Sequence, residues 1–128
     1  MKVLLDTHLL LWAANEPKRI PKAARDLIEE TENDLLFSAA SMWEIAIKRS
    51  LGRADFQVNP RVLWRALLEN GYSELAITSE HVIQVDQLPP KHKDPFDRVL
   101  VGQAMVEGIT LVTNDQKLMG YPGAIHKV

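Results

Sequence analysis

Short apolar runs alternate along this chain with longer segments in which apolar residues recur at helical spacing. Short runs bounded by polar residues are typical of buried parallel strands, whereas the helical spacing is typical of amphipathic helices. The short runs predict strands over residues 2–5, 35–37, 75–78, 109–113 and 125–128. The longer segments predict helices over residues 7–14, 21–31, 41–51, 60–70, 79–85 and 95–107.

Proline and glycine support several of these boundaries. Proline is favoured at the first helical position and glycine just after the last one. Residues of these types stand at the expected places: Pro21, Pro60, Pro95, Gly52, Gly71 and Gly108. Because the strands are interleaved with helices, they imply parallel βαβ units with helices on both faces of one sheet. We therefore predict an α/β fold with a central, mainly parallel sheet.

Composition limits the class of protein. The 128 residues, 46% hydrophobic and 25% charged, predict one domain over residues 1–128. The chain has no cysteine, which excludes disulfides and thiolate metal sites. No apolar stretch approaches the length of a membrane span and no signal peptide is evident, so we expect a cytoplasmic location. The net charge of −2 gives no overall attraction to nucleic acid, so such a partner would be held locally or through bound metal.

Four acidic residues stand where a predicted strand ends or a helix begins. Asp6 and Asp115 each follow an apolar run, and Glu44 and Asp97 fall in the expected first turn of their helices. In a βα unit, the helix begins at the edge where the preceding strand ends. All four carboxylates can therefore meet at the carboxyl edge of a parallel sheet, where open α/β folds place their active sites.

A group of carboxylates without cysteine or paired histidines suits a hard cation such as Mg²⁺ or Mn²⁺. The cation offsets their mutual repulsion and keeps them ionised. A cation in such a place orients a phosphodiester, lowers the pKa of a bound water and offsets charge on the leaving oxygen. This spacing therefore favours a metal-dependent phosphodiesterase.

Each acid also has a structural interpretation. Asp6 and Asp115 can cap the helix or turn that follows them. Ser41 and Glu44 fit a capping box, and Glu44 can instead pair with Lys48 one turn later. Asp94 before Pro95 is a good N-cap, with Asp97 favoured by the helix dipole. Only the coincidence of the four acids at one edge favours a site over four separate structural roles.

Longer motifs resemble a known family. The strings LLDTHLLLWA, SAASMWEIAIK, HKDPFDRVLVGQA and LVTND are similar to those of PIN domains, and more narrowly of VapC-type ribonuclease toxins from prokaryotic toxin–antitoxin pairs. The resemblance implies a Rossmann-like α/β/α sandwich that cuts RNA with Mg²⁺ or Mn²⁺. It also implies a cognate antitoxin as partner, and a homodimer.

The resemblance assigns roles to individual residues. It places the catalytic and metal-binding carboxylates on Asp6, Glu44, Asp97 and Asp115. Polar residues expected near the metal are Thr7, Ser38, Thr113 and Asn114. Independently of the resemblance, the position of several basic residues suggests that they flank the acids and could contact phosphates, although a run of charges is usually a solvated surface: Lys48, Arg49, Arg53, Lys91, His92, Lys93 and Arg98.

Other functions fit the sequence less well. A haloacid-dehalogenase-type phosphatase needs a second Asp two residues after the first, where this chain has His8. A phosphoacceptor receiver domain needs paired early acids and a late lysine, a pattern that is absent. The remaining alternative is a catalytically silent PIN-like module that binds RNA or protein, and the intact set of acids argues against it.

Overall fold

The computed structural model describes residues 1–91 and 93–128. His92, which the sequence suggests as a flank of the site, lies outside the described residues. The strands are β1 (Lys2–Leu5), β2 (Asp34–Ser38), β3 (Ser73–Leu75), β4 (Thr110–Thr113) and β5 (Ile125–Lys127). The α-helices are α1 (Thr7–Asn15), α2 (Lys22–Glu29), α3 (Ala39–Ser50), α4 (Pro60–Glu69), α5 (Ser79–Asp86) and α6 (Pro95–Glu107). Short 3₁₀ turns form η1 (Pro17–Arg19), η2 (Ala54–Phe56) and η3 (Gln116–Leu118).

One parallel sheet organises the chain. Its strand order is β3-β2-β1-β4-β5, and each neighbouring pair is parallel. The central strand β1 pairs Val3 with Leu35 on one side and with Thr110 on the other. Because all strands point the same way, their carboxyl ends lie at one edge of the sheet. The predicted α/β fold is confirmed, and the sheet is wholly rather than mainly parallel.

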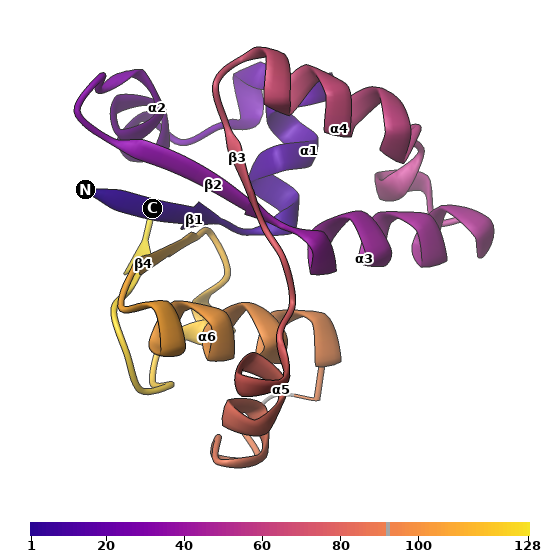
Figure 1. Cartoon of the computed structure of the whole chain (residues 1–128). Coiled ribbons are helices and arrows are strands. Elements are labelled where there is room, and N and C mark those ends of the chain that lie inside the picture. Colours follow the sequence, from indigo (N-terminus) through magenta and orange to yellow (C-terminus); the bar gives the residue numbers. More distant parts are fainter. Residues whose placement is uncertain (92) are drawn as a thin grey trace.

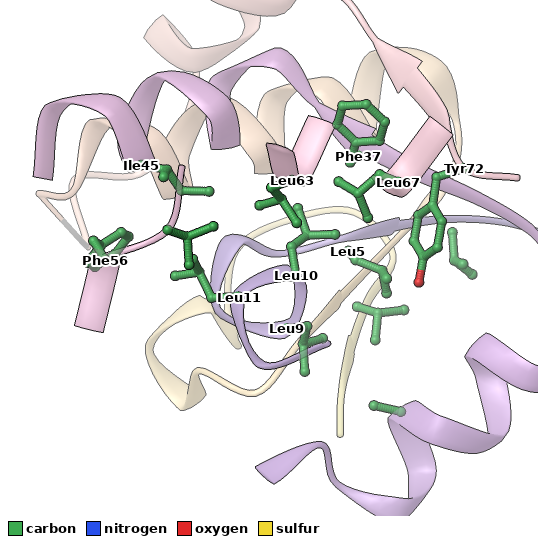
Figure 2. Close-up of a cluster of buried hydrophobic side chains, with 14 residues drawn as sticks. Leu5, Leu9, Leu10, Leu11, Phe37, Ile45, Phe56, Leu63, Leu67 and Tyr72 are labelled. Carbon is green, nitrogen blue, oxygen red and sulfur yellow. The ribbon is translucent and has the colours of Figure 1, made fainter. Parts of the chain in front are cut away.

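Helices cover both faces of the sheet (Figure 1). Side chains alternate along β1, so that Val3 and Leu5 enter one core and Leu4 enters the other. The first core packs β1 and β2 against α1, α2 and α4, and Figure 2 shows it around Leu10 and Leu63. The second core packs the other face against α6. Burial on both faces explains why the strands are read as continuous apolar runs.

Most boundaries differ by a residue or two from the sequence expectation, and the differences in β3 and α3 bear on the site. The third strand was expected at 75–78, but β3 spans Ser73–Leu75. Its last pairing partner is Ser38, because α3 begins at the next residue and leaves β3 no strand to continue along. α3 begins at Ala39 instead of residue 41, with Ser38 as its N-cap. Across residues 1–91 and 93–128, every helix is too short or too polar to cross a bilayer.

The helices α1, α3 and α6 begin at the carboxyl edge of the sheet. α1 and α3 follow β1 and β2 directly, and α6 begins at this edge before the chain returns along β4. In Figure 1, α3 extends beyond the end of β2, away from the sheet. This overhang gives α3 one side that faces α1 and another that faces the start of α6.

Candidate active site

Asp6 stands at the junction of β1 and α1. Its backbone amide donates to the carbonyl of Val112 at 3.0 Å and so extends the pairing of β1 with β4. Its side chain caps α1, because Oδ1 accepts from the amide of Leu9 at 3.0 Å. The other oxygen, Oδ2, accepts a hydrogen bond from the hydroxyl of Thr113. The structural and functional interpretations of Asp6 are thus compatible.

Asp6 is buried, with 5% of the residue exposed. Burial raises its pKa, against smaller lowering effects of the Thr113 and Leu9 hydrogen bonds and of the charge on His8. The two hydrogen-bond donors are neutral, so they orient the carboxylate without cancelling its charge. Ionised Asp6 is therefore costly in the isolated fold and would gain from a nearby cation.

Asp115 lies close to Asp6 through a shared hydroxyl. The amide of Asp115 donates to Oγ1 of Thr113 at 3.0 Å, while that hydroxyl donates to Asp6. Oδ1 of Asp115 accepts from the amide of Lys117 at 2.9 Å and so caps η3. One surface hollow contains both acids and is lined by Asp6, His8, Trp12, Arg19, Asn114 and Asp115.

Glu44 lies on α3 in a different environment. Its side chain is buried, and Oε2 accepts from Nζ of Lys48 at 2.6 Å. Oε1 is also buried and has no hydrogen-bond partner among residues 1–91 and 93–128. The expectation that Glu44 lies in the first helical turn was wrong, since α3 begins at Ala39. The capping-box interpretation fails with it, while the pairing with Lys48 is confirmed.

Lys48 joins α3 to the start of α6. Its ammonium lies 3.5 Å from Oδ2 of Asp94, and over the rings of Phe56 and Phe96 at 4.9 and 5.6 Å. Burial alone would lower the pKa of Lys48, but the hydrogen bond and charge of Glu44 and the charge of Asp94 outweigh it and raise the pKa. Lys48 is therefore a built-in counter-ion for two carboxylates.

Asp97 occupies the first turn of α6, as the sequence predicts. Asp94 is the N-cap of that helix and accepts from the amides of Phe96 and Asp97 at 2.9 and 3.2 Å. Asp97 is half-buried, while Leu100 and Val101 on the same helical face are fully buried. The carboxylate of Asp97 therefore lies at the rim of the second core, near the start of the helix.

A hydroxyl pair links the two parts of the site. Thr7, next to Asp6, donates from Oγ1 to Oγ of Ser41 at 2.9 Å, and Ser41 lies one turn before Glu44. The acids share one edge, but among residues 1–91 and 93–128 no three acidic or histidine side chains are close enough to hold a metal ion. The site is thus an open arrangement of carboxylates.

The donor set nevertheless fits a hard cation. The unpartnered Oε1 of Glu44 and the buried carboxylate of Asp6 are oxygen atoms whose negative charge the protein only partly compensates. Mg²⁺ takes few protein ligands and retains several waters, so it does not need a closed cage of side chains. Asp6 and Asp115, which line one hollow, could hold such an ion directly, whereas Glu44 and Asp97 are not among the residues that line that hollow.

The other predicted residues have varied surroundings. Ser38 donates to Oε1 of Gln103 at 2.5 Å and accepts from the amide of Ala40, so its hydroxyl supports the start of α3. The side-chain amide of Asn114 donates to the carbonyl of Val128 at 2.8 Å. The guanidinium of Arg98 donates to several carbonyls, including that of Pro89 at 2.8 Å, and holds the segment before α6.

The sequence did not indicate Arg19 as part of the site, and it favoured a core or interface role for Trp12. Both line the hollow that contains Asp6 and Asp115. Trp12 lies four residues after His8, so its position on the same face of α1 could have been read from helical spacing. Arg19 belongs to η1, which follows no clear periodicity, and no local pattern places it there.

Comparison with known proteins gives consistent results. The family model described as "PIN domain" matches residues 3–122. Ribonuclease VapC22 of Mycobacterium tuberculosis is 31% identical over 120 residues, which cover 93% of this chain and 91% of that protein.

Two solved structures share the fold. The crystal structure of VapBC2 from Rickettsia felis bound to a DNA fragment from their promoter matches with a TM-score of 0.73 and 16% identity, over 100% of this chain and 99% of that one. DNA-bound VapBC from Salmonella typhimurium matches with a TM-score of 0.68 and 18% identity, over 99% of this chain and 98% of that one.

Proposed function

Because this chain belongs to the PIN domain family and is similar to VapC-type toxins within it, we propose that it is a metal-dependent endoribonuclease. The reaction is hydrolysis of phosphodiester bonds in RNA. The catalytic and metal-binding residues are Asp6, Glu44, Asp97 and Asp115. The observation that carries this proposal is the hollow that contains Asp115 and the buried Asp6, each of which accepts a hydrogen bond from a neutral donor.

Bound Mg²⁺ or Mn²⁺ supplies Lewis acidity and a water of lowered pKa. The chain's own residues prepare the place for it. Thr113 and the amide of Leu9 fix both oxygens of Asp6, while Lys48 fixes one oxygen of Glu44 and leaves the other without a partner. Thr7, through Ser41, holds α1 and α3 in register at the edge of the sheet. Such preorganisation reduces the rearrangement needed during reaction.

The proposed partners follow from the same family membership. The two similar solved structures are VapBC assemblies on DNA. We propose that this chain likewise pairs with an antitoxin protein, forms a homodimer and acts on RNA in the cytoplasm. An active ribonuclease would harm its own cell, which gives an inhibitory partner a clear role.

One observation favours the competing function of a catalytically silent binding module. Glu44 is already paired with Lys48, and the four acids do not form a closed cluster within the described chain. A silent module would bind RNA or protein with equal affinity whether or not a divalent cation is present. Metal dependence therefore separates the two functions.

The test is a cleavage assay on unstructured RNA with Mg²⁺ or Mn²⁺ and then with EDTA. We expect cleavage only with the metal, together with a rise in Tm on metal addition, since binding to the folded state stabilises it. Asp97→Asn should lose both effects. Asp26→Asn is the matched control, because Asp26 is an exposed acid on α2 that pairs with Lys22. Undiminished cleavage after chelation, with the same activity in Asp97→Asn, would refute the mechanism.

A further inference from the structure

A basic residue lines the hollow that contains the two acids. Arg19 ends η1 and lies on the wall formed with Trp12 and His8, while Asp6 and Asp115 line the same hollow. A second hollow shares Trp12 and Arg19 with the first and is also lined by Glu16 and Asp55. Arg19 thus lines two neighbouring hollows, one of which contains the acids.

The side chain of Arg19 packs on Trp12 but remains accessible to solvent. Its guanidinium carbon lies 4.7 Å from the centroid of the Trp12 ring, and Trp12 itself packs against the first core. The backbone amide of Arg19 donates to the carbonyl of Glu16 at 2.8 Å, which holds η1 against the end of α1. The side chain of Arg19 remains 58% exposed. Stacking on a core-anchored ring therefore orients a charge that solvent can still reach.

The existing ion pair of Arg19 is weak enough to be exchanged. Within residues 1–91 and 93–128, its guanidinium hydrogen-bonds to Glu16, from Nη1 to Oε2 at 3.3 Å. Both side chains are more than half exposed, and exposed pairs of this kind contribute little stability. A phosphate can accept two parallel hydrogen bonds from the guanidinium fork, a stronger arrangement than this single contact.

An RNA strand needs such a charge at this place. Asp6 and Asp115 repel phosphates, and the net charge of −2 provides no general attraction. A bound cation would attract the phosphate that is cut, but the neighbouring phosphates still lie beside carboxylates. A guanidinium that lines the same hollow offsets that repulsion.

We propose that Arg19, stacked on Trp12, binds a backbone phosphate of the RNA strand next to the phosphate that is cut. This inference rests on the proposed ribonuclease function and adds a substrate-binding residue to it. The strand would pass from the hollow that contains the acids to the part of the surface where Arg19 is exposed. Glu16 then acts as a competitor that the RNA displaces when it binds.

The test compares Arg19→Ala with Lys18→Ala in the full chain with Mg²⁺ or Mn²⁺. Lys18 is the matched control, because it is the exposed neighbour in the same turn but lines a separate hollow with Ile20 and Arg25. We expect Arg19→Ala to raise KM for a single-stranded RNA about tenfold with kcat little changed. Lys18→Ala should leave both values close to those of the parent chain.

Two further variants and a binding measurement sharpen the test. Glu16→Gln removes the competitor and should lower KM, whereas Arg19→Lys keeps the charge without the fork and should give an intermediate KM. Binding of a non-cleavable 2′-O-methyl RNA should show a salt slope smaller by about one in Arg19→Ala. These variants decide the question even if Arg19→Ala folds poorly.

The outcomes separate this inference from the proposed function. If the parent chain does not cleave RNA with either metal, the ribonuclease proposal itself fails. If the parent cleaves, but Arg19→Ala and Lys18→Ala have the same KM and salt slope, the phosphate subsite is refuted while the ribonuclease stands. An unchanged KM in Glu16→Gln together with full activity in Arg19→Lys would refute the role of the guanidinium fork.

Discussion

The two parts of the site hold their carboxylates in different ways. In the neutral-donor part, which comprises Asp6, Thr113 and Asp115, hydroxyl and amide groups orient the acids. In the lysine part, which comprises Glu44, Lys48 and Asp94, an ammonium ion lies between two carboxylates. The two parts meet through the hydrogen bond from Thr7 to Ser41.

This difference indicates which carboxylates a bound cation would stabilise most. Neutral donors fix the geometry of Asp6, but its charge is compensated only in part, and burial makes that charge costly. Lys48 neutralises much of the charge in its own part, so removal of Lys48 should harm the fold more than removal of an acid from the neutral-donor part. In the proposed enzyme, the neutral-donor part would therefore bind a cation at a cost to the stability of the metal-free fold. The lysine part would stabilise the fold as well as hold a carboxylate in place.

The largest effect should come from Asp6→Asn. Asparagine caps a helix about as well as aspartate, so α1 should keep its N-cap while the negative charge disappears. We expect cleavage to fall at least about a hundredfold, as for loss of a group that acts directly on the reacting charges. The Tm of the EDTA-treated protein should stay the same or rise. A variant that unfolds yet keeps activity in its folded fraction would show that Asp6 only caps the helix.

Lys48→Met should have the largest effect on stability. It leaves Glu44 buried without its partner, and loss of one member of a buried pair costs about 3–5 kcal/mol, somewhat less here because Lys48 is partly exposed. Urea unfolding of the EDTA-treated protein measures the change. The double variant Glu44→Gln with Lys48→Met should recover most of the loss.

Lys22→Met is the matched control for this comparison. Lys22 also forms an ion pair with an acid four residues later, Asp26, at 3.0 Å, but both side chains are exposed. The control should therefore cost less than about 1 kcal/mol. Equal losses in Lys48→Met and Lys22→Met would contradict the distinction between the two parts of the site.

The smallest effect should be a pH dependence of stability. The pKa of Asp6 is raised in the folded state, so the folded protein favours the protonated carboxyl more than the unfolded chain does. The contribution of Asp6 is therefore most favourable below its unfolded pKa and declines as pH rises through the folded pKa. Asp6→Asn should be more stable than the parent near neutral pH, and the two should converge in acid. Urea unfolding of both proteins between acid and neutral pH, with EDTA present, measures the difference in their free energies of unfolding. A difference that does not change with pH would contradict the argument that burial raises the pKa of Asp6.

Much of the fold could be predicted from local pattern. The apolar runs and the proline and glycine positions gave the order of strands and helices, since each depends on residues close in sequence. The third strand was misplaced because its length is set by β2, which ends where α3 begins. A strand's limits depend on its partner, and the partner is distant in the chain.

In the candidate site, too, local contacts could be predicted from the sequence and long-range contacts could not. The pairing of Glu44 with Lys48 could be expected from a spacing of one helical turn, and the structure confirms it. The hydrogen bond from Thr113 to Asp6 joins opposite ends of the chain and depends on β1 and β4 lying side by side. The assignment of the four acids to catalysis remains a prediction.

The sequence by itself determined the element types and placed the acids after strands or near helix starts, because periodicity and capping are local. Only the tertiary structure decided the non-local neighbours: the Thr113 hydroxyl beside Asp6, Asp94 as a second acid beside Lys48, and a guanidinium stacked on Trp12 in the hollow. Those neighbours come from strand order and from the packing of α1, α3, α6 and η1. The free energy of a buried carboxylate depends on charges and hydrogen-bond donors within a few ångströms of it. These groups often come from distant segments of the chain, and sequence spacing does not show which segments lie together.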